Sequence, residues 1–289
     1  MTQEAPPSEV VLSLTCPDQP GIVHAVSAFL LEHGGDIVDS QQFSDRVSGR
    51  FFMRVDVRFE NADVALSQLR SEFATVAEPL AMQWTLTDVE QRQRVAILVS
   101  RFGHCLNDLL FRWSAGQLTI DIPLIVSNHR DLEPLAGSYG IPFVHVPVTP
   151  ETKQEAEQEL LRLVKEYDID LVVLARYMQI LSDELCEQLA GRAINIHHSF
   201  LPSFKGGKPY HQAHDRGVKL VGATAHYVTA ELDEGPIIEQ EVVRVNHSFT
   251  AQDLVVAGRD VECIALARAV QWHAEHRILL NGHRTVILR

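Results

Sequence analysis

Beyond residue 94, the chain alternates segments that are almost wholly apolar with segments of helical periodicity. Consecutive side chains of a strand point to opposite faces, so a strand that is apolar throughout must be covered on both faces. Such strands, joined by helices, are typical of a parallel sheet with helices on each side. The apolar segments are 95–99, 122–126, 143–146 and 171–175, with a helical pattern at 151–166. This region is therefore predicted to be a doubly wound, mostly parallel α/β domain.

The N-terminal region shows a different pattern. In residues 51–59, apolar side chains occupy every second position, which is typical of a strand with one buried face. The strand and helix patterns around it give the order βαββαβ, the ferredoxin-like α+β arrangement. A polar stretch at 87–94 separates the two patterns. We therefore predict two domains, residues 1–90 and 91–289, the second closing with a hairpin turn at 281–282.

Length and charge limit the classes of protein. A chain of 289 residues is long enough for about two domains. The net charge of −13 disfavours binding to nucleic acids and to anionic membranes, so neither is an expected partner. The four cysteines are far apart and form no CxxC pair, which argues against a disulfide framework and a zinc ribbon. Because the sequence shows no secretory signal and no membrane span, we expect a cytoplasmic protein.

The segment 193–202 combines a short strand pattern with polar residues at its end. In open α/β sheets, ligands bind at the carboxyl ends of the strands. Asn195 and His197 are two residues apart, so their side chains point to the same side of the strand, about 6–7 Å apart. An amide donor and an imidazole would then face one substrate carbonyl. The alternative is that both side chains only satisfy backbone groups at the sheet edge.

A second polar cluster follows another apolar strand pattern, at 226–236. It begins with His226 and continues into an acidic loop that contains Asp233 and is closed by Gly235-Pro236. Taken alone, this cluster could equally be a solvated acidic turn. Together, the two clusters supply the groups that transfer or hydrolyse an acyl group. Amide and imidazolium stabilise an oxyanion, while a carboxylate orients or deprotonates the nucleophile.

These motifs resemble those of the formyltetrahydrofolate-dependent formyltransferases, and the resemblance runs from Arg94 to Arg289. The pattern Asn-x-His followed by Ser-x-Leu-Pro is met at 195–202, and a later His-x6-Asp by His226 and Asp233. Within that superfamily the chain is more similar to formyltetrahydrofolate deformylases, on segments such as ELDEGPII and AGRDVE. Residues 9–88 resemble an ACT domain, the ferredoxin-like module that senses small amino acids and precedes the hydrolase in that family.

One difference from the transferases concerns the nucleophile. The purine-pathway transferase carries a Gly-x-Gly-Ser-Asn loop whose backbone N–H groups hold the acceptor's phosphate. Here the segment 100–107 has bulky Phe102, His104 and Leu106 instead, which implies that water replaces the amine acceptor. The net charge of −13 also disfavours methionyl-tRNA as an acceptor. The alternatives are a formyltransferase with another amine acceptor and a non-catalytic protein that senses folate and amino acids.

The resemblance implies hydrolysis of 10-formyltetrahydrofolate to tetrahydrofolate and formate, for one-carbon and purine metabolism. Asn195 and protonated His197 would stabilise the oxyanion, Asp233 would accept or relay the proton of water, and His226 would support Asp233 or the water. No metal and no prosthetic group are expected. The residues implied to bind the folate are Arg176, Tyr177, Met178, Gln179, Ile180, Leu181, Thr229 and Ala230.

For the N-terminal domain, the resemblance implies an effector site at a turn after the first strand. Its residues are Asp18, Gln19, Pro20 and Gly21, which could also form an ordinary turn. The unpaired edges of an open sheet favour pairing between subunits, so a homo-oligomer, arranged as a dimer of dimers, is expected. A weaker hypothesis for the whole chain is a metal hydrolase with ligands within 211–215, a segment that holds two histidines and an aspartate.

Overall fold

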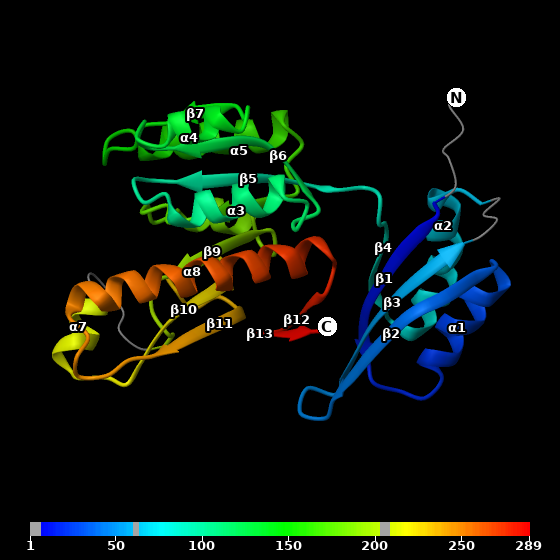
Figure 1. Ribbon diagram of the computed structural model, residues 1–289. Coiled ribbons are helices and arrows are strands. Elements are labelled where there is room, and N and C mark those ends of the chain that lie inside the picture. The colour runs from blue at the N-terminus through cyan, green and yellow to red at the C-terminus, as the bar shows by residue number, and fades with distance from the viewer. Residues whose placement is uncertain (1–6, 60–63, 203–208) are drawn as a thin grey trace. The chain divides into compact units, whose positions relative to one another are not determined.

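The computed structural model describes residues 7–59, 64–202 and 209–289 (Figure 1). The chain divides into two compact units, Met1–Arg92 with Glu275–Arg289, and Gln93–Ala274. None of the described helices combines the length and hydropathy needed to cross a bilayer.

The N-terminal unit is built on a four-stranded antiparallel sheet in the order β2-β3-β1-β4. Its elements, in chain order, are β1 (Glu9–Pro17), α1 (Ile22–Glu32), β2 (Gly35–Asp45), β3 (Arg50–Phe59), α2 (Leu66–Ala77), a short 3-10 helix (Glu78–Leu80) and β4 (Gln83–Asp88). Both α-helices cover the same face of the sheet (Figure 1). The predicted βαββαβ arrangement is confirmed.

The alternation within β3 determines which face the helices cover. Met53 and Val55 point toward α1 and α2 and belong to the apolar core of this unit. Phe52 and Arg54 point to the opposite face, where both are also buried. A strand with one exposed face would not bury these two side chains, so the second face of the sheet must also be covered.

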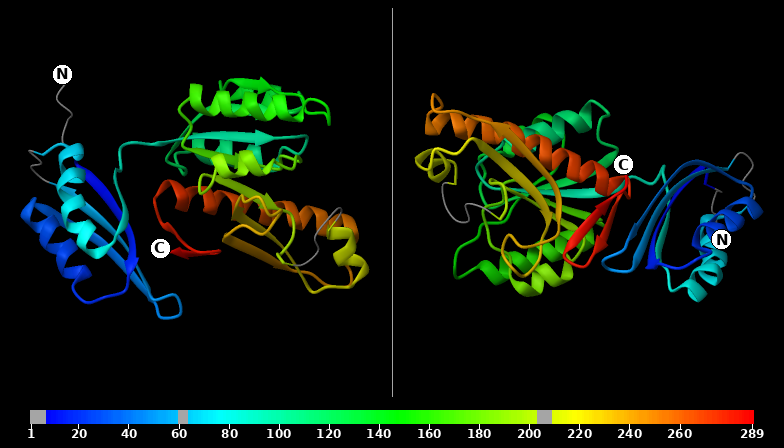
Figure 2. Two further views of the ribbon diagram at one scale, coloured as in Figure 1. Left: turned by 180° about the vertical axis from the view of Figure 1, so that it is seen from behind. Right: turned by 90° about the horizontal axis from the view of Figure 1, so that it is seen from below.

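The C-terminal hairpin covers that second face (Figure 2). It consists of β12 (Ile278–Asn281) and β13 (Arg284–Ile287), and its Leu279 packs with Leu288 against Phe52. The Arg54 side chain donates from Nε to the carbonyl of Glu275 at 3.1 Å. The expected division at residue 90 places this hairpin with the second domain, whereas the structure places it with the first. Two short apolar strands carry no sequence signal that identifies the sheet they cover.

The hairpin is expected to contribute to the stability of the N-terminal unit. Leu279 is 8% exposed, so Leu279→Ala should lower the free energy of unfolding by about 2–4 kcal/mol, because it removes buried apolar contact and leaves a cavity. Leu280, the next residue of the strand, is 45% exposed and serves as the matched control. Urea unfolding followed by circular dichroism measures both variants. Equal effects of Leu279→Ala and Leu280→Ala would contradict this role of the hairpin.

The second unit is built on a seven-stranded sheet in the order β11-β10-β9-β8-β5-β6-β7. Strands β5 to β9 are parallel, and β10 and β11 add an antiparallel edge. The strands are β5 (Gln93–Val99), β6 (Ile120–Ser127), β7 (Phe143–His145), β8 (Leu171–Leu174), β9 (Ala193–His197), β10 (Leu220–Tyr227) and β11 (Ile237–Arg244). The predicted mostly parallel, doubly wound sheet is confirmed.

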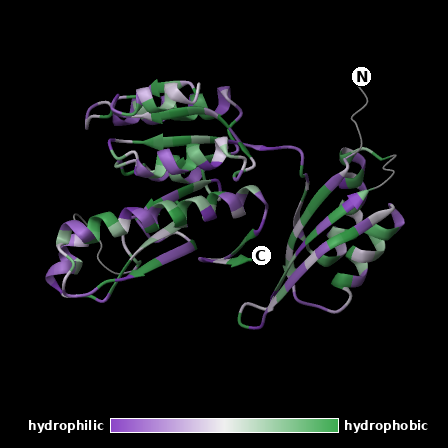
Figure 3. Ribbon diagram, viewed as in Figure 1, coloured by the Kyte–Doolittle hydropathy of each residue, from purple (hydrophilic) through white to green (hydrophobic). Residues whose placement is uncertain are grey.

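Helices cover both faces of this sheet, as the apolar strands require. Figure 3 shows β5 coloured as hydrophobic along most of its length. One face packs against α5 (Lys153–Glu166) and α6 (Asp183–Gln188), and the other against α3 (His104–Ser114) and α8 (Ala251–Ala274). The remaining helices are α4 (Glu133–Ser138) and α7 (Pro209–Asp215). The chain reverses its winding direction between β5 and β8, and ligand sites of such sheets lie at the carboxyl ends of the strands beside this point.

Candidate active site

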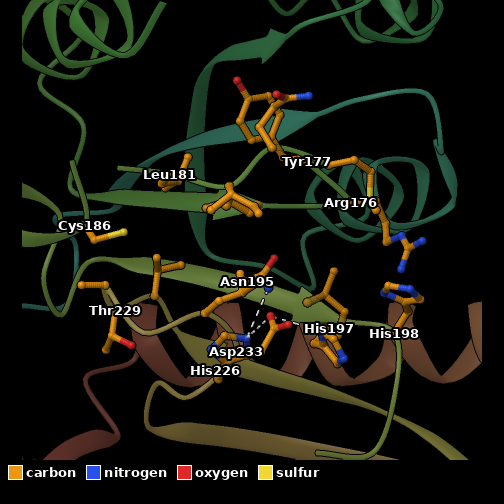
Figure 4. A pocket seen from close by; sticks show the side chains of 18 residues that line it. Arg176, Tyr177, Leu181, Cys186, Asn195, His197, His198, His226, Thr229 and Asp233 are labelled. Atoms are coloured by element: carbon orange, nitrogen blue, oxygen red, sulfur yellow. Dashed lines mark hydrogen bonds and ion pairs between the residues drawn. The ribbon is translucent and has the colours of Figure 1, made fainter. Parts of the chain in front are cut away.

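The end of β9 carries the first two site residues. Asn195 and His197 lie on one face of this strand, and β10 runs antiparallel beside it. His226 of β10 is paired directly opposite Asn195, so the two side chains share a face. Figure 4 shows Asn195, His197 and His226 gathered around Asp233. The structure thus brings together the four residues that the sequence analysis assigned to catalysis.

Asp233 reaches this place because the loop after β10 folds back tightly. The backbone N–H of Tyr227 donates to the carbonyl of Pro236 at 3.0 Å, which closes the loop. A side chain at Gly235 would lie 1.7 Å from the carbonyl oxygen of Tyr227, so only glycine allows this approach. Asp233 itself has a φ of 58°, a left-handed conformation that is unusual outside glycine. The loop therefore fixes the carboxylate over the end of the sheet.

Asp233 and His197 form the central ion pair. Nδ1 of His197 lies 3.2 Å from Oδ1 of Asp233, and both side chains are largely buried. Burial alone would raise the pKa of Asp233, but the hydrogen bond from His197 and the charge of this imidazole outweigh it and hold the pKa below its ordinary value. Nε2 of His197 is buried and has no hydrogen-bond partner among the described residues.

His226 lies closer to Asn195 than to Asp233. Its Nδ1 lies 2.9 Å from the carbonyl oxygen of Tyr227, which can only accept, so Nδ1 carries the proton. Burial lowers the pKa of His226, against the effect of that hydrogen bond, so the ring is neutral and Nε2 is an acceptor. Nδ2 of Asn195 donates to this Nε2 at 3.2 Å. The distance from Nε2 to Oδ1 of Asp233 is longer, 3.9 Å.

The residues of the Ser-x-Leu-Pro motif form a loop that is anchored to β10. Oγ1 of Thr224 donates to the carbonyl of Ser199 at 3.0 Å and accepts from the backbone N–H of Leu201 at 3.1 Å. Gln240 of β11 donates to the carbonyl of Leu201 at 3.0 Å. These contacts fix the chain immediately after His197. The motif therefore positions the end of β9.

A cavity of about 240 Å³ lies over the ends of β8, β9 and β10. Every residue that the sequence analysis assigned to folate binding lines it, from Arg176 to Leu181 together with Thr229 and Ala230. The loop after β8 is held by Ser100, whose Oγ accepts from the backbone N–H of Met178 at 2.9 Å. The sequence did not indicate several further lining residues, which share no motif: Leu174, Cys186, Ile196, His198 and Val228.

Two groups of residues that the sequence predicts as ligand sites lie outside this cavity. The turn with Asp18 and Gly21 lies in the N-terminal unit, where Gly21 begins α1 with a φ of 97°. The histidines at 211 and 214 lie on α7, and neither takes part in a metal-binding group among the described residues. Among the described residues, the group of side chains that could hold a metal ion is His104, Cys105 and Glu262, which the sequence did not indicate.

Residues 93–270 match the formyl transferase family, and residues 10–74 match the ACT domain family. A formyltetrahydrofolate deformylase from Corynebacterium sp. (strain P-1) is 56% identical over 279 residues, which cover 96% of this chain and 98% of that protein. The chain belongs to the formyltetrahydrofolate deformylase family. The resemblance expected from the motifs is therefore confirmed for nearly the whole length.

Solved structures separate the deformylases from the related transferases. The deformylase from Burkholderia mallei matches this chain with a TM-score of 0.94 and 53% identity, covering 98% of this chain and 100% of that one. A phosphoribosylglycinamide formyltransferase from Anaplasma phagocytophilum matches with a TM-score of 0.63 and 34% identity, covering 68% of this chain and 95% of that one. The chain thus shares its whole architecture with a deformylase and only part of it with a transferase.

Proposed function

We propose that this protein hydrolyses 10-formyltetrahydrofolate to tetrahydrofolate and formate. The observation that carries the proposal is the convergence of Asn195, His197 and Asp233 on one cavity, in a chain of the deformylase family. In the proposed reaction, a water oxygen adds to the formyl carbon, the bond from this carbon to nitrogen breaks, and the nitrogen takes up a proton.

The oxyanion of the tetrahedral intermediate is stabilised by two donors. Asn195 uses one N–H of its amide to bind His226, which leaves the other N–H for the substrate oxygen. Protonated His197 offers its unpartnered Nε2–H to the same oxygen, while Nδ1 remains on Asp233. Donors that are fixed before the substrate arrives stabilise developing charge without a cost of reorganisation. His226 is thus a positioning residue, because it orients the amide of Asn195.

Asp233 accepts the proton of the attacking water. Its lowered pKa keeps the carboxylate ionised at neutral pH, so it can act both as the partner of the imidazolium and as a proton acceptor. The left-handed backbone at this residue holds the carboxylate beside His197. The attacking water, the base Asp233 and the oxyanion donors Asn195 and His197 therefore lie in one site.

The cavity binds the pteridine end of the folate. Its walls are largely apolar, with Met178 and Leu181 on the loop after β8 and Thr229 and Ala230 on the loop after β10. Burial raises the pKa of Tyr177 to about 12, so its hydroxyl is neutral at physiological pH. Apolar walls with a few fixed polar groups are typical of pockets for fused aromatic rings.

Formate release in the absence of any amine tests the proposed function. The purified protein is incubated with 10-formyltetrahydrofolate alone, and formate is followed with a coupled dehydrogenase. We expect multiple turnovers under these conditions, because water is the nucleophile. Turnover that begins only after an amine acceptor is added would identify the protein as a formyltransferase instead.

We propose in addition that the N-terminal unit binds a small amino acid at the turn Asp18–Gly21 and joins subunits into a dimer of dimers. The four residues are exposed, and a side chain at Gly21 would meet no atom within 4 Å, so the turn offers open space for a ligand at the beginning of α1. Because the open sheet has unpaired edges, pairing between subunits would cover them. An effector bound at such a contact shifts the balance between subunit arrangements.

Free glycine or methionine, added to the assay, is therefore expected to change the rate of hydrolysis several-fold. The coupling free energy between an effector site and an active site is typically about 1–3 kcal/mol. Gly21→Leu should abolish this response and leave the basal rate unchanged. Gly282→Leu is the matched control, because Gly282 also has a positive φ and open space but lies in the C-terminal hairpin. A response that survives in Gly21→Leu, or an absence of any response to amino acids, would contradict the proposed site.

A further inference from the structure

A buried group of charged and polar side chains lies beside the proposed active site and has no part in the mechanism above. At its centre is Glu262 of α8, which is 1% exposed. Nε2 of His104 lies 2.7 Å from its Oε2, and the hydroxyl of Tyr210 donates to its Oε1 at 2.8 Å. Nη1 of Arg176 lies 3.5 Å from Oε2. Side chains from three separate segments of the chain therefore meet at the carboxylate that α8 supplies.

This group does not suit a metal ion. His104, Cys105 and Glu262 could offer three ligand atoms. Both carboxylate oxygens of Glu262 are already engaged, however, and the guanidinium of Arg176 would repel a cation at this distance. Burial opposes ionisation of Glu262, but the contacts with His104 and Arg176 outweigh it and lower its pKa, so the carboxylate balances the guanidinium.

Some N–H groups of the Arg176 guanidinium have no hydrogen-bond acceptor among the described residues. The residue is 9% exposed and lines the active-site cavity. Its Nε and Nη1 have no hydrogen-bond partner among the described residues, although Nη1 is near Glu262. Its Cζ lies 5.4 Å from the centre of the Phe102 ring. Burying N–H groups of a charged side chain without acceptors is costly, so an acceptor that binds there would be favoured.

The backbone at Arg176 supports a role for its side chain. Arg176 has a φ of 66°, a left-handed conformation that favours glycine. Asp233 of the proposed active site has the same left-handed conformation, with a φ of 58°. Figure 4 shows that the side chain of Arg176 extends toward His198, away from Leu181 and the apolar wall. The guanidinium therefore serves the catalytic end of the cavity.

The neighbouring imidazoles make this end of the cavity suitable for an anion. Burial and the charges of Arg176 and His197 lower the pKa of His198 to about 4, so His198 is neutral at physiological pH. His197 lies next to it, with ring centroids 5.2 Å apart, and its Nε2 has no partner among the described residues. The wall formed by Arg176, His198 and His197 thus contains nitrogen atoms of Arg176 and His197 that have no hydrogen-bond partner among the described residues.

We propose that Arg176 forms a subsite for a small carboxylate, the formate released by the reaction. This inference rests on the proposed function, in which a neutral formyl amide becomes an anion. When the bond from carbon to nitrogen breaks, the formyl carbon keeps its own oxygen and the oxygen of water, and the protons pass to nitrogen and solvent. The product carries one negative charge on two oxygens, which match the N–H donors of a guanidinium. Glu262 and Phe102 hold the guanidinium in place for it.

Direct binding of isotope-labelled formate, measured by NMR line broadening without any folate, tests the subsite. Arg176→Gln should weaken formate binding at least about tenfold, because a charge-assisted hydrogen bond to the carboxylate is lost. Arg259→Gln is the matched control, since Cζ of Arg259 also lies near the Phe102 ring, at 5.7 Å from its centre, but this residue does not line the cavity. We expect Arg259→Gln to change formate binding less than about twofold.

Equal formate affinity in wild type and Arg176→Gln would overturn the subsite, as would an equal loss in Arg259→Gln, which would reveal only an effect of net charge. If Arg176→Gln does not fold, formate binding to Arg176→Lys is measured instead. The Nε–H resonance of Arg176 is then also followed in the wild-type protein, and it must shift when formate is added. Formate binding and hydrolysis are measured separately. A protein that hydrolyses the folate but binds formate independently of Arg176 refutes the subsite alone, whereas one that binds formate through Arg176 without hydrolysis refutes the proposed function.

Discussion

Alanine at Asn195 or at His197 is expected to lower kcat by about 10²–10³-fold, the usual effect of removing one donor from an oxyanion site. Each substitution removes an N–H group that faces the developing negative charge, whereas the apolar walls that hold the pteridine remain. The affinity for folate should therefore change little. Steady-state kinetics of formate release, together with equilibrium binding of tetrahydrofolate, measures the two effects separately.

The control for this pair of variants is His214→Ala. His214 is an exposed histidine of α7 that does not line the cavity, so its replacement should leave kcat unchanged. It also tests the metal-hydrolase hypothesis, which would require this side chain as a ligand. If Asn195→Ala or His197→Ala retains a near-normal kcat, the role assigned to that residue is wrong.

Asp233→Asn is expected to lower kcat by about 10²–10⁴-fold, the range typical for loss of a general base. The amide keeps the size of the carboxylate but neither accepts the proton of water nor balances an imidazolium at His197. Because the pKa of Asp233 is held below its ordinary value, the carboxylate is ionised throughout the neutral range. The loss of activity should therefore be similar at every pH at which the protein is folded.

Glu231→Gln is the matched control for Asp233→Asn. Glu231 belongs to the same acidic loop, but its side chain is exposed and it does not line the cavity. It should retain wild-type kinetics. An Asp233→Asn variant that keeps its activity and only shifts its pH optimum would show that another group takes the proton.

Periodicity explains why so much of the fold could be predicted. The apolar strands around Val95 and Leu171 require cover on both faces, and the alternation in 51–59 requires a strand with one face on a helical layer. Spacing was equally informative for part of the site. Asn195 and His197 are two positions apart at the end of a strand, which places both on one face in any sheet.

The features of the site that the sequence does not predict depend on contacts between segments that are far apart in the chain. The group around Glu262 combines His104, Arg176 and Tyr210, and no spacing in the sequence relates them. Arg176 was predicted to bind folate through its neighbours in the chain, and it does line the cavity. The direction of its side chain follows from the left-handed φ and from the packing of α8, which local patterns do not encode.

The hairpin at the C-terminus means that the ACT-like unit cannot be removed as a simple N-terminal extension. The chain enters this unit at its beginning and returns to it after α8, so the fold of the first ninety or so residues is completed only by the last fifteen. A deletion that ends near Arg92 would leave Leu279 and Leu288 without the sheet face that buries them. Exchange of this ACT-like unit between proteins would therefore require two cuts, one at each crossing of the chain, and a gene fusion at one end alone would leave one face of the sheet uncovered.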